Sequence, residues 1–160
     1  MKQWIIGEAI DHVSDEAIKV FRLKRLPVSS VIFVTRGMIL AHSWPIATTS
    51  SEVTINQDMK AIIVKSKLIP AYLSHLLRAL TPQVLRRVET AAHGTKRLKT
   101  ETVLNLKMPC PSMETQRKIV AYLDATHDEV KEMQRIQADD RSLLEQVEQS
   151  ILAQAFRGEL

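Results

Sequence analysis

The sequence predicts an α+β fold, in which a small mixed domain over residues 1–112 is followed by a long C-terminal helix of coiled-coil type over residues 113–157. Two observations predict this division. The first part contains short β-branched and apolar runs bounded by turn residues, as strands do. The tract from Thr115 to Phe156 contains no Gly and no Pro and is rich in residues that favour helix. A chain of 160 residues has room for one such domain and one extended element.

Apolar spacing and turn residues predict the elements of the first domain. Leucines that recur at helical spacing predict a helix from Pro70 to Glu89, and Thr81 with Pro82 should start its second half. We expect strands at residues 31–36, 61–66 and 105–110, and a loop followed by a strand over residues 48–56.

The ends of the long helix are marked by residues that break or cap helices. Pro109 and Pro111 precede it, and Ser112 can cap it with Thr115 at the third position. Gly158 stands where a helix stop is expected.

An imperfect heptad seam runs along this helix, and Gln137 and Asp140 interrupt it in the middle. A helix of about 40 residues spans about 60 Å, which is more than the preceding domain can cover. We therefore expect much of the helix to pack against a partner. The seam consists of the apolar residues Val130, Met133, Leu144, Val147 and Ile151.

Composition argues against several classes of protein. The opening residues lack the apolar core of a secretory signal and no later stretch suits a membrane span, so a cytoplasmic protein is expected. The lone cysteine, Cys110, cannot form an internal disulfide and is expected to be a buried thiol. The four glycines are too far apart for a dinucleotide-binding or P-loop phosphate cradle, so we expect no cofactor.

No catalytic residue and no metal site is expected. The five histidines are scattered at spacings that match no metal site. Asp128, Glu129 and Lys131, with Asp124 just upstream, resemble the acidic cluster of a nuclease that uses Mg²⁺. Neighbouring side chains on a helix point in different directions, so we interpret these residues as a solvated helix face. A nuclease stays as an alternative that would need convergent carboxylates.

The net charge of +4 is unevenly distributed. Residues 1–115 hold 16 Lys and Arg against 9 Asp and Glu, a net +7, whereas residues 116–160 hold 6 against 9, a net −3. The basic first domain suits a polyanion, which the acidic remainder would repel.

The loops of the first domain are rich in groups that hydrogen-bond base edges and phosphates. Arg pairs bidentately with guanine, Asn and Gln pair with adenine, and Lys suits phosphate oxygens. Alternatively, Asn56 and Gly94 only form turns and the basic side chains are solvated; the residues alone do not decide between the two. The candidates for DNA contact are Arg36, His42, Trp44, Asn56, Gln57, Lys60, Lys96 and Arg97.

The order of these segments resembles a target-recognition domain and the conserved helix of the specificity subunits of type I restriction-modification enzymes, over residues 28–160. Four motifs carry the resemblance. They are Ile55-Asn56-Gln57-Asp58, the His93-Gly94-Thr95 turn that precedes a Pro-rich strand, the helix start Glu114-Thr115-Gln116-Arg117-Lys118-Ile119-Val120, and the closing Ala155-Phe156-Arg157-Gly158-Glu159-Leu160.

The resemblance implies a non-catalytic subunit that reads one half of a bipartite site in double-stranded DNA. Separate modification subunits would methylate adenine with S-adenosylmethionine, and separate restriction subunits would cleave. Because such a methyltransferase takes its target base out of the stack, a rigid reader has to position it. The long helix would act as a spacer and as a docking surface for the modification subunits.

The family normally has two recognition domains and two helical regions, and this chain has one of each. It is therefore either a half-subunit, which could form an antiparallel homodimer on a palindromic site, or a fragment of a longer subunit. Residues 1–27 lack the Trp-containing start of a complete recognition domain, although Trp4 is a candidate remnant. The alternative function is an interaction protein that binds modification subunits without reading DNA.

Overall fold

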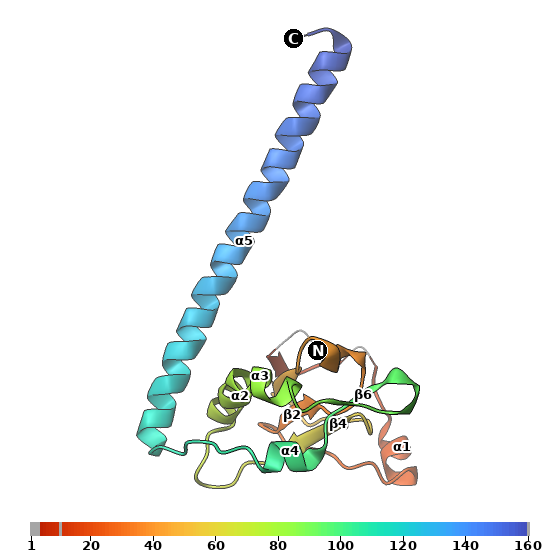
Figure 1. Ribbon diagram of the computed structural model, residues 1–160, viewed down its shortest axis with the longest axis vertical. Coiled ribbons are helices and arrows are strands. Elements are labelled where there is room, and N and C mark those ends of the chain that lie inside the picture. Colours follow the sequence, from red (N-terminus) through yellow and green to blue (C-terminus); the bar gives the residue numbers. More distant parts are fainter. Residues whose placement is uncertain (1–3, 10, 160) are drawn as a thin grey trace. The chain divides into compact units, whose positions relative to one another are not determined.

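The computed structural model describes residues 4–9 and 11–159, and it confirms an α+β domain followed by a long C-terminal helix (Figure 1). The chain divides into two compact units, residues 1–120 and residues 121–160. Along the chain the elements are β1 (Ile5–Ile6), α1 (Asp15–Val20), β2 (Val31–Val34), the 3-10 helix η1 (Met38–Ala41), β3 (Ile46–Thr49), β4 (Met59–Ile62), α2 (Pro70–Ala79), α3 (Thr81–Leu85), β5 (Glu89–Thr90), the 3-10 helix η2 (Ala92–Gly94), β6 (Lys96–Arg97), α4 (Thr100–Leu104) and α5 (Met113–Arg157).

A mixed sheet with strand order β1-β3-β2-β4 organises the first unit. β1 runs parallel to β3, and the pairs β2–β3 and β2–β4 are antiparallel. Val31 and Phe33 of the central strand β2 point into one apolar cluster, whereas Ile32 points into a second cluster on the other face. Because β2 is buried on both faces, its sequence is a continuous apolar run rather than an alternating one.

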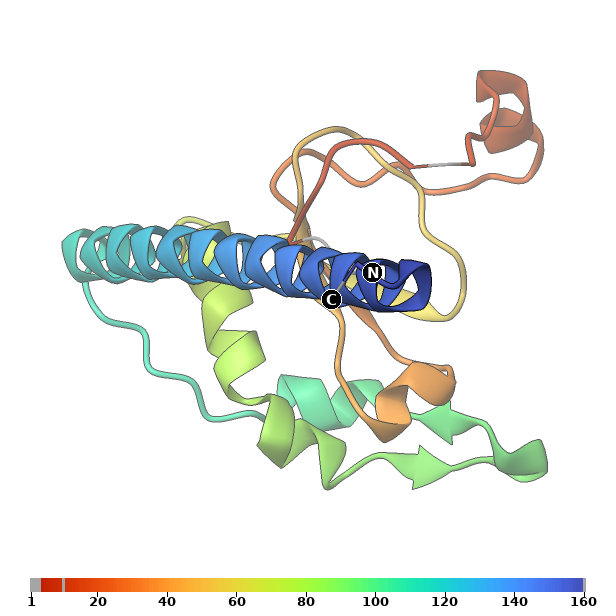
Figure 2. The ribbon, with the colours of Figure 1, turned by 90° about the horizontal axis from the view of Figure 1, so that it is seen from above.

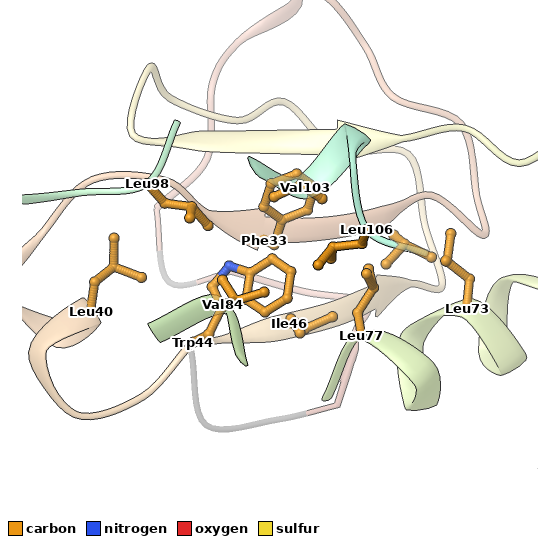
Figure 3. Packing of buried hydrophobic residues seen from close by; sticks show 11 residues of the cluster. Phe33, Leu40, Trp44, Ile46, Leu73, Leu77, Val84, Leu98, Val103 and Leu106 are labelled. Carbon is orange, nitrogen blue, oxygen red and sulfur yellow. The ribbon is translucent and has the colours of Figure 1, made fainter. Parts of the chain in front are cut away.

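The main core lies between the sheet and helices α2, α3 and α4 (Figure 3). Phe33 and Trp44 meet edge to face in it, with ring centroids 5.5 Å apart. Leu98 extends the core beyond β6 and is 2% exposed. The buried members of this core are Val31, Phe33, Leu40, Trp44, Ile46, Leu73, Leu77, Val84, Leu98, Val103 and Leu106.

The structure corrects three of the expected strands. The strand expected over residues 61–66 is β4, which begins at Met59 and ends at Ile62, because Ile62 pairs with Val31, the first residue of its partner β2. Over residues 48–56 the strand comes first and the loop second, because β3 ends at Thr49. The buried hydroxyl of Thr49 donates to the carbonyl of Pro27 and accepts from the amide of Ser30, so this polar residue is satisfied inside a strand. Residues 105–110 form no strand, since α4 occupies the preceding residues and Pro109 has no amide hydrogen to donate to a sheet.

The long helix begins and ends as the capping residues predict. The hydroxyl of Ser112 accepts a hydrogen bond from the amide of Thr115 at 3.2 Å, as an N-cap does. Gly158 adopts φ +72°, a left-handed conformation that ends the helix. The helix expected over 70–89 divides into α2 and α3 at Leu80, directly before Thr81, and it ends at Leu85 because Glu89 pairs with Arg97 in β5.

Cys110 is exposed, so the expectation of a buried thiol is wrong. It lies between two prolines in the extended segment before α5, where little can cover it. No helix among the described residues is both long enough and apolar enough to cross a membrane.

Gln116 fastens the first turn of α5 to the rest of the first unit. Its side chain is fully buried, and its Oε1 accepts from the amide of Ile69 at 2.9 Å. Its Nε2 donates to the carbonyls of Lys67 at 3.0 Å and of Pro111 at 2.9 Å. One amide therefore joins the loop before α2 to the segment that leads into α5.

Candidate nucleic-acid interface

Three segments that are far apart in the sequence meet at the end of β2. The amide of Gly37 donates to the carbonyl of Lys96 at 3.0 Å, and the amide of Leu98 donates to the carbonyl of Thr35 at 2.8 Å. On the other side, the amides of Thr35 and Arg36 both donate to the carbonyl of Asp58, at 2.7 and 3.2 Å. Backbone bonds thus fix the end of β2, the turn before β4 and the β5–β6 hairpin against one another.

Glycines allow the chain to make this junction. Gly37 adopts φ +136°, a conformation that side chains disfavour, where the chain leaves β2 and turns into η1. Gly94, at φ +80°, follows His93 in the tip of the β5–β6 hairpin, where the amide of Ala91 donates to the carbonyl of Thr95. The His93-Gly94-Thr95 motif is therefore a hairpin turn, and the hairpin lies beside η1 (Figure 2).

We call four exposed side chains at this junction, together with the half-buried Lys96 beside them, the basic edge: Arg36, Gln57, Lys60, Lys96 and Arg97. Arg36 and Arg97 form an antiparallel bridge pair, so their side chains are direct cross-strand neighbours. Like charges opposite each other are destabilising, and a bound anion would relieve that repulsion. Among the described residues, neither Lys60 nor Arg97 takes part in an ion pair, which leaves both charges available to a ligand.

The structure brings five of the eight predicted DNA contacts together in the basic edge. His42 is exposed at the end of η1, which contacts β6. Asn56 is exposed beside Gln57, but its Oδ1 accepts the amide of Asp58 at 3.1 Å, so part of its hydrogen-bonding capacity closes a turn.

Trp44 does not belong to this surface. It is 3% exposed, packs on Phe33, and donates from Nε1 to the carbonyl of Val34 at 3.1 Å. An indole in the core cannot stack on a base, so we correct the expectation of a DNA contact there. Its loop position misled the prediction, because the apolar partners come from distant parts of the chain.

Replacing Trp44 with Phe is expected to lower the free energy of unfolding by about 1–3 kcal/mol, since a buried hydrogen bond and core volume are lost. Urea unfolding followed by circular dichroism measures this. DNA affinity at a temperature where the variant is folded should match that of the wild type. A folded variant with weakened DNA binding would return Trp44 to the interface.

Sequence reasoning missed Asp58 as a part of the site. Its Oδ1 is buried, makes no hydrogen bond among the described residues, and lies 3.8 Å from Nε of Arg36. Its place in the Ile55-Asn56-Gln57-Asp58 motif was visible in the sequence, but its proximity to Arg36 depends on the pairing of β2 with β4. In the part of the chain that the structure describes, no three His, Cys, Asp or Glu side chains gather as a metal site requires.

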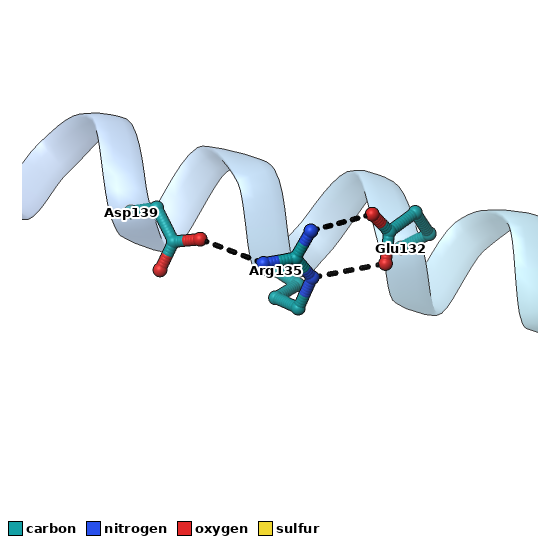
Figure 4. Close-up of polar contacts among 3 residues, drawn as sticks. All are labelled: Glu132, Arg135 and Asp139. Carbon is teal, nitrogen blue, oxygen red and sulfur yellow. Dashed lines mark hydrogen bonds and ion pairs between the residues drawn. The ribbon is translucent and has the colours of Figure 1, made fainter.

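A second candidate surface lies on α5. The five seam residues are between 43% and 70% exposed, although large apolar side chains are usually covered. Away from the seam, Arg135 pairs with Glu132 at 2.7 Å and with Asp139 at 3.0 Å (Figure 4). The Arg135 guanidinium lowers the pKa of the Glu132 carboxyl. The helix thus carries charged pairs on one face and an uncovered apolar stripe on another.

Comparison with known families finds a match to the model of the type I restriction modification DNA specificity domain over residues 6–138. The chain is 27% identical over 124 residues to the specificity subunit of the type I restriction enzyme EcoR124I/EcoR124II from Escherichia coli, covering 78% of this chain and 31% of the relative. It is 25% identical over 117 residues to the MjaIX specificity subunit of Methanocaldococcus jannaschii, covering 73% of this chain and 26% of the relative.

Two solved structures share the fold. A chain from a study of complex assembly and conformational transition in the type I R-M system matches with a TM-score of 0.71 and 26% identity, over 86% of this chain and 33% of that one. The HsdS subunit from Thermoanaerobacter tengcongensis matches with a TM-score of 0.61 and 26% identity, over 86% of this chain and 32% of that one. The chain thus spans between about a quarter and a third of the length of the relatives it matches.

Proposed function

Because the chain belongs to the family of type I restriction modification DNA specificity domains, we propose that it is a non-catalytic module that reads one half of a bipartite site in double-stranded DNA. The relatives from Escherichia coli and Methanocaldococcus jannaschii are both specificity subunits of type I restriction enzymes. Residues 1–112 would read the DNA, and residues 113–157 would dock the module to its partners.

The single observation that carries this proposal is the basic edge. It places Arg36 opposite Arg97 with Lys60 and Lys96 nearby, on the part of the chain with the net positive charge. Lys60 and Arg97 have no ion-pair partner among the described residues, and with the amide side chain of Gln57 beside them the surface can contact phosphates and base edges at once. These groups lie on or next to strands and are fixed by backbone bonds, which suits a rigid reader.

Replacing Arg97 with Gln is expected to weaken DNA binding to all sequences alike and to reduce the slope of log affinity against log salt concentration by about 1. The reason is that one phosphate contact, with the counterions it releases, is lost. Fluorescence anisotropy of labelled duplex DNA over a series of salt concentrations measures both quantities.

The matched control is Lys24→Gln, which removes the same charge from an exposed residue shortly after α1. Figure 2 shows the α1 segment apart from the β5–β6 hairpin. It should leave the slope within error of the wild type. An unchanged slope for Arg97→Gln, or an equal loss for both variants, would remove the basic edge from the DNA interface.

The apolar stripe of α5 supports the second half of the proposal, the docking of modification subunits and, through them, of restriction subunits. S-adenosylmethionine would then be bound by the modification subunits, so this chain needs no cofactor of its own. A second copy of the chain could also bind the apolar stripe of α5. The resulting antiparallel homodimer would read a palindromic site. We also propose a cytoplasmic location, where the chain would meet both DNA and these subunits.

A further inference from the structure

We infer that Asp58 is a positioning residue that presents the guanidinium of Arg36 to a guanine in the major groove, so that the Arg36–Asp58 pair determines one base of the half-site. This inference rests on the proposed DNA-reading function. It separates two roles within the basic edge, base reading by Arg36 and phosphate binding by Arg97.

The backbone holds Asp58 and Arg36 at a fixed separation. The carbonyl of Asp58 accepts from the amides of Thr35 and Arg36 and from the hydroxyl of Thr35 at 3.1 Å. The amide of Asp58 donates to the side chain of Asn56. With its own amide and carbonyl both hydrogen-bonded, the backbone of Asp58 is fixed beside that of Arg36, so its carboxylate starts from a fixed point next to the guanidinium.

The carboxylate lies on the Nε side of the guanidinium. Oδ1 of Asp58 is 3.8 Å from Nε of Arg36, and among the described residues neither terminal nitrogen of Arg36 has a hydrogen-bond partner. Those two terminal nitrogens form the fork that pairs with O6 and N7 of guanine. Asp58 therefore restrains the stem of the guanidinium and leaves its reading end open.

Charge favours a base over a phosphate as the target of Arg36. The pair of Arg36 and Asp58 is neutral overall, and the carboxylate repels a nearby phosphate. A guanine edge is uncharged and gains directional hydrogen bonds instead. Arg97, which has no ion-pair partner among the described residues, keeps its full charge for the backbone of the DNA.

The buried Oδ1 of Asp58 would gain a hydrogen bond from Nε of Arg36 when DNA binds. A carboxylate oxygen without a hydrogen bond is costly, and a separation of 3.8 Å is too long to satisfy it. When a base holds the fork of Arg36 in place, a small shift can bring Nε within bonding distance of Oδ1. DNA binding would then complete a bond that the free protein leaves open.

The experiment selects duplexes from a randomised double-stranded DNA library with the full chain, together with the modification subunits of a type I system, and sequences the enriched pool. Wild type, Asp58→Asn, Arg36→Lys and the double variant are compared. We expect Asp58→Asn to lose discrimination at one G·C pair by about ten- to a hundredfold, while its salt slope does not fall. Arg36→Lys keeps the charge, loses the fork, and should relax the same base pair.

The double variant tests the coupling. In the Arg36→Lys background, Asp58→Asn should cause no further loss at that position, because Asp58 acts through Arg36. Glu52→Gln is the matched control, since Oε2 of Glu52 also lies 3.8 Å from an arginine nitrogen, Nη1 of Arg25. Its selected site should equal that of the wild type. Melting followed by circular dichroism confirms that each variant is folded.

The outcomes distinguish the inference from the proposed function. A wild-type chain that enriches no sequence would overturn the proposed function and this inference with it. A wild type that selects a site which Asp58→Asn selects equally well would overturn only the inference. Equal losses at every position, or a further loss in the double variant, would show that Asp58 does not act through Arg36.

Discussion

Replacing Gln116 with Leu is expected to lower the free energy of unfolding of the first unit by about 2–3 kcal/mol. The leucine fills similar space but makes none of the hydrogen bonds. The amide of Ile69 and the carbonyls of Lys67 and Pro111 would each lose a partner that the glutamine side chain now supplies. Leaving such groups unpaired in a partly buried position costs more than the bonds themselves contribute.

Urea unfolding followed by tryptophan fluorescence measures this effect selectively. The chain has two tryptophans, Trp4 and Trp44, and both belong to the first unit. Gln57→Leu is the matched control, because it makes the same change at an exposed position of that unit and should alter stability by less than about 0.5 kcal/mol. If the two variants unfolded at the same urea concentration, the buried amide of Gln116 would not stabilise the fold.

Local signals predicted the elements that depend on local chemistry. The Ser112 cap, the left-handed Gly158 and the break before Thr81 each depend on residues within a turn of one another. The continuous apolar run of β2 also identified its strand. The order of loop and strand over residues 48–56 was predicted wrongly because it depends on residues distant in the sequence. Thr49 is stable in a buried strand since Pro27 and Ser30 satisfy its hydroxyl.

The candidate site shows the same division. Arg36, Gln57 and Arg97 were identified by residue type, yet nothing in the sequence shows that Arg36 and Arg97 pair across a bridge. The prediction that Trp44 contacts DNA was wrong because it considered only the loop in which Trp44 lies. The fold brings Phe33 and Val34 beside the indole, and these contacts bury it in the core. Residue types thus predicted the chemistry of the surface, but the fold determines which of the predicted residues lie on it.

Introducing aspartate at Leu144 and Val147 together is expected to weaken docking of the chain to modification subunits by about a hundredfold or more. Both side chains are exposed on α5, at 70% and 55%, and lie one turn apart on the seam. Burying an apolar side chain contributes about 1.5–3 kcal/mol, and every 1.4 kcal/mol is tenfold in affinity. Light scattering on mixtures of the chain and the subunits, with titration calorimetry for the affinity, measures the loss.

The control is Ser142→Asp with Gln149→Asp, which adds the same two charges at heptad positions that face away from the seam. If it weakened docking equally, charge rather than the apolar stripe would be responsible.

Asp140 bears on the identity of the partner, because it interrupts the seam near its middle. A second copy paired over the whole seam, in either direction, would bring Asp140 close to its own counterpart, and like charges at such positions are destabilising. A modification subunit that offers a cation there would meet no such penalty, so the wild-type chain is expected to bind that subunit more tightly than it binds itself.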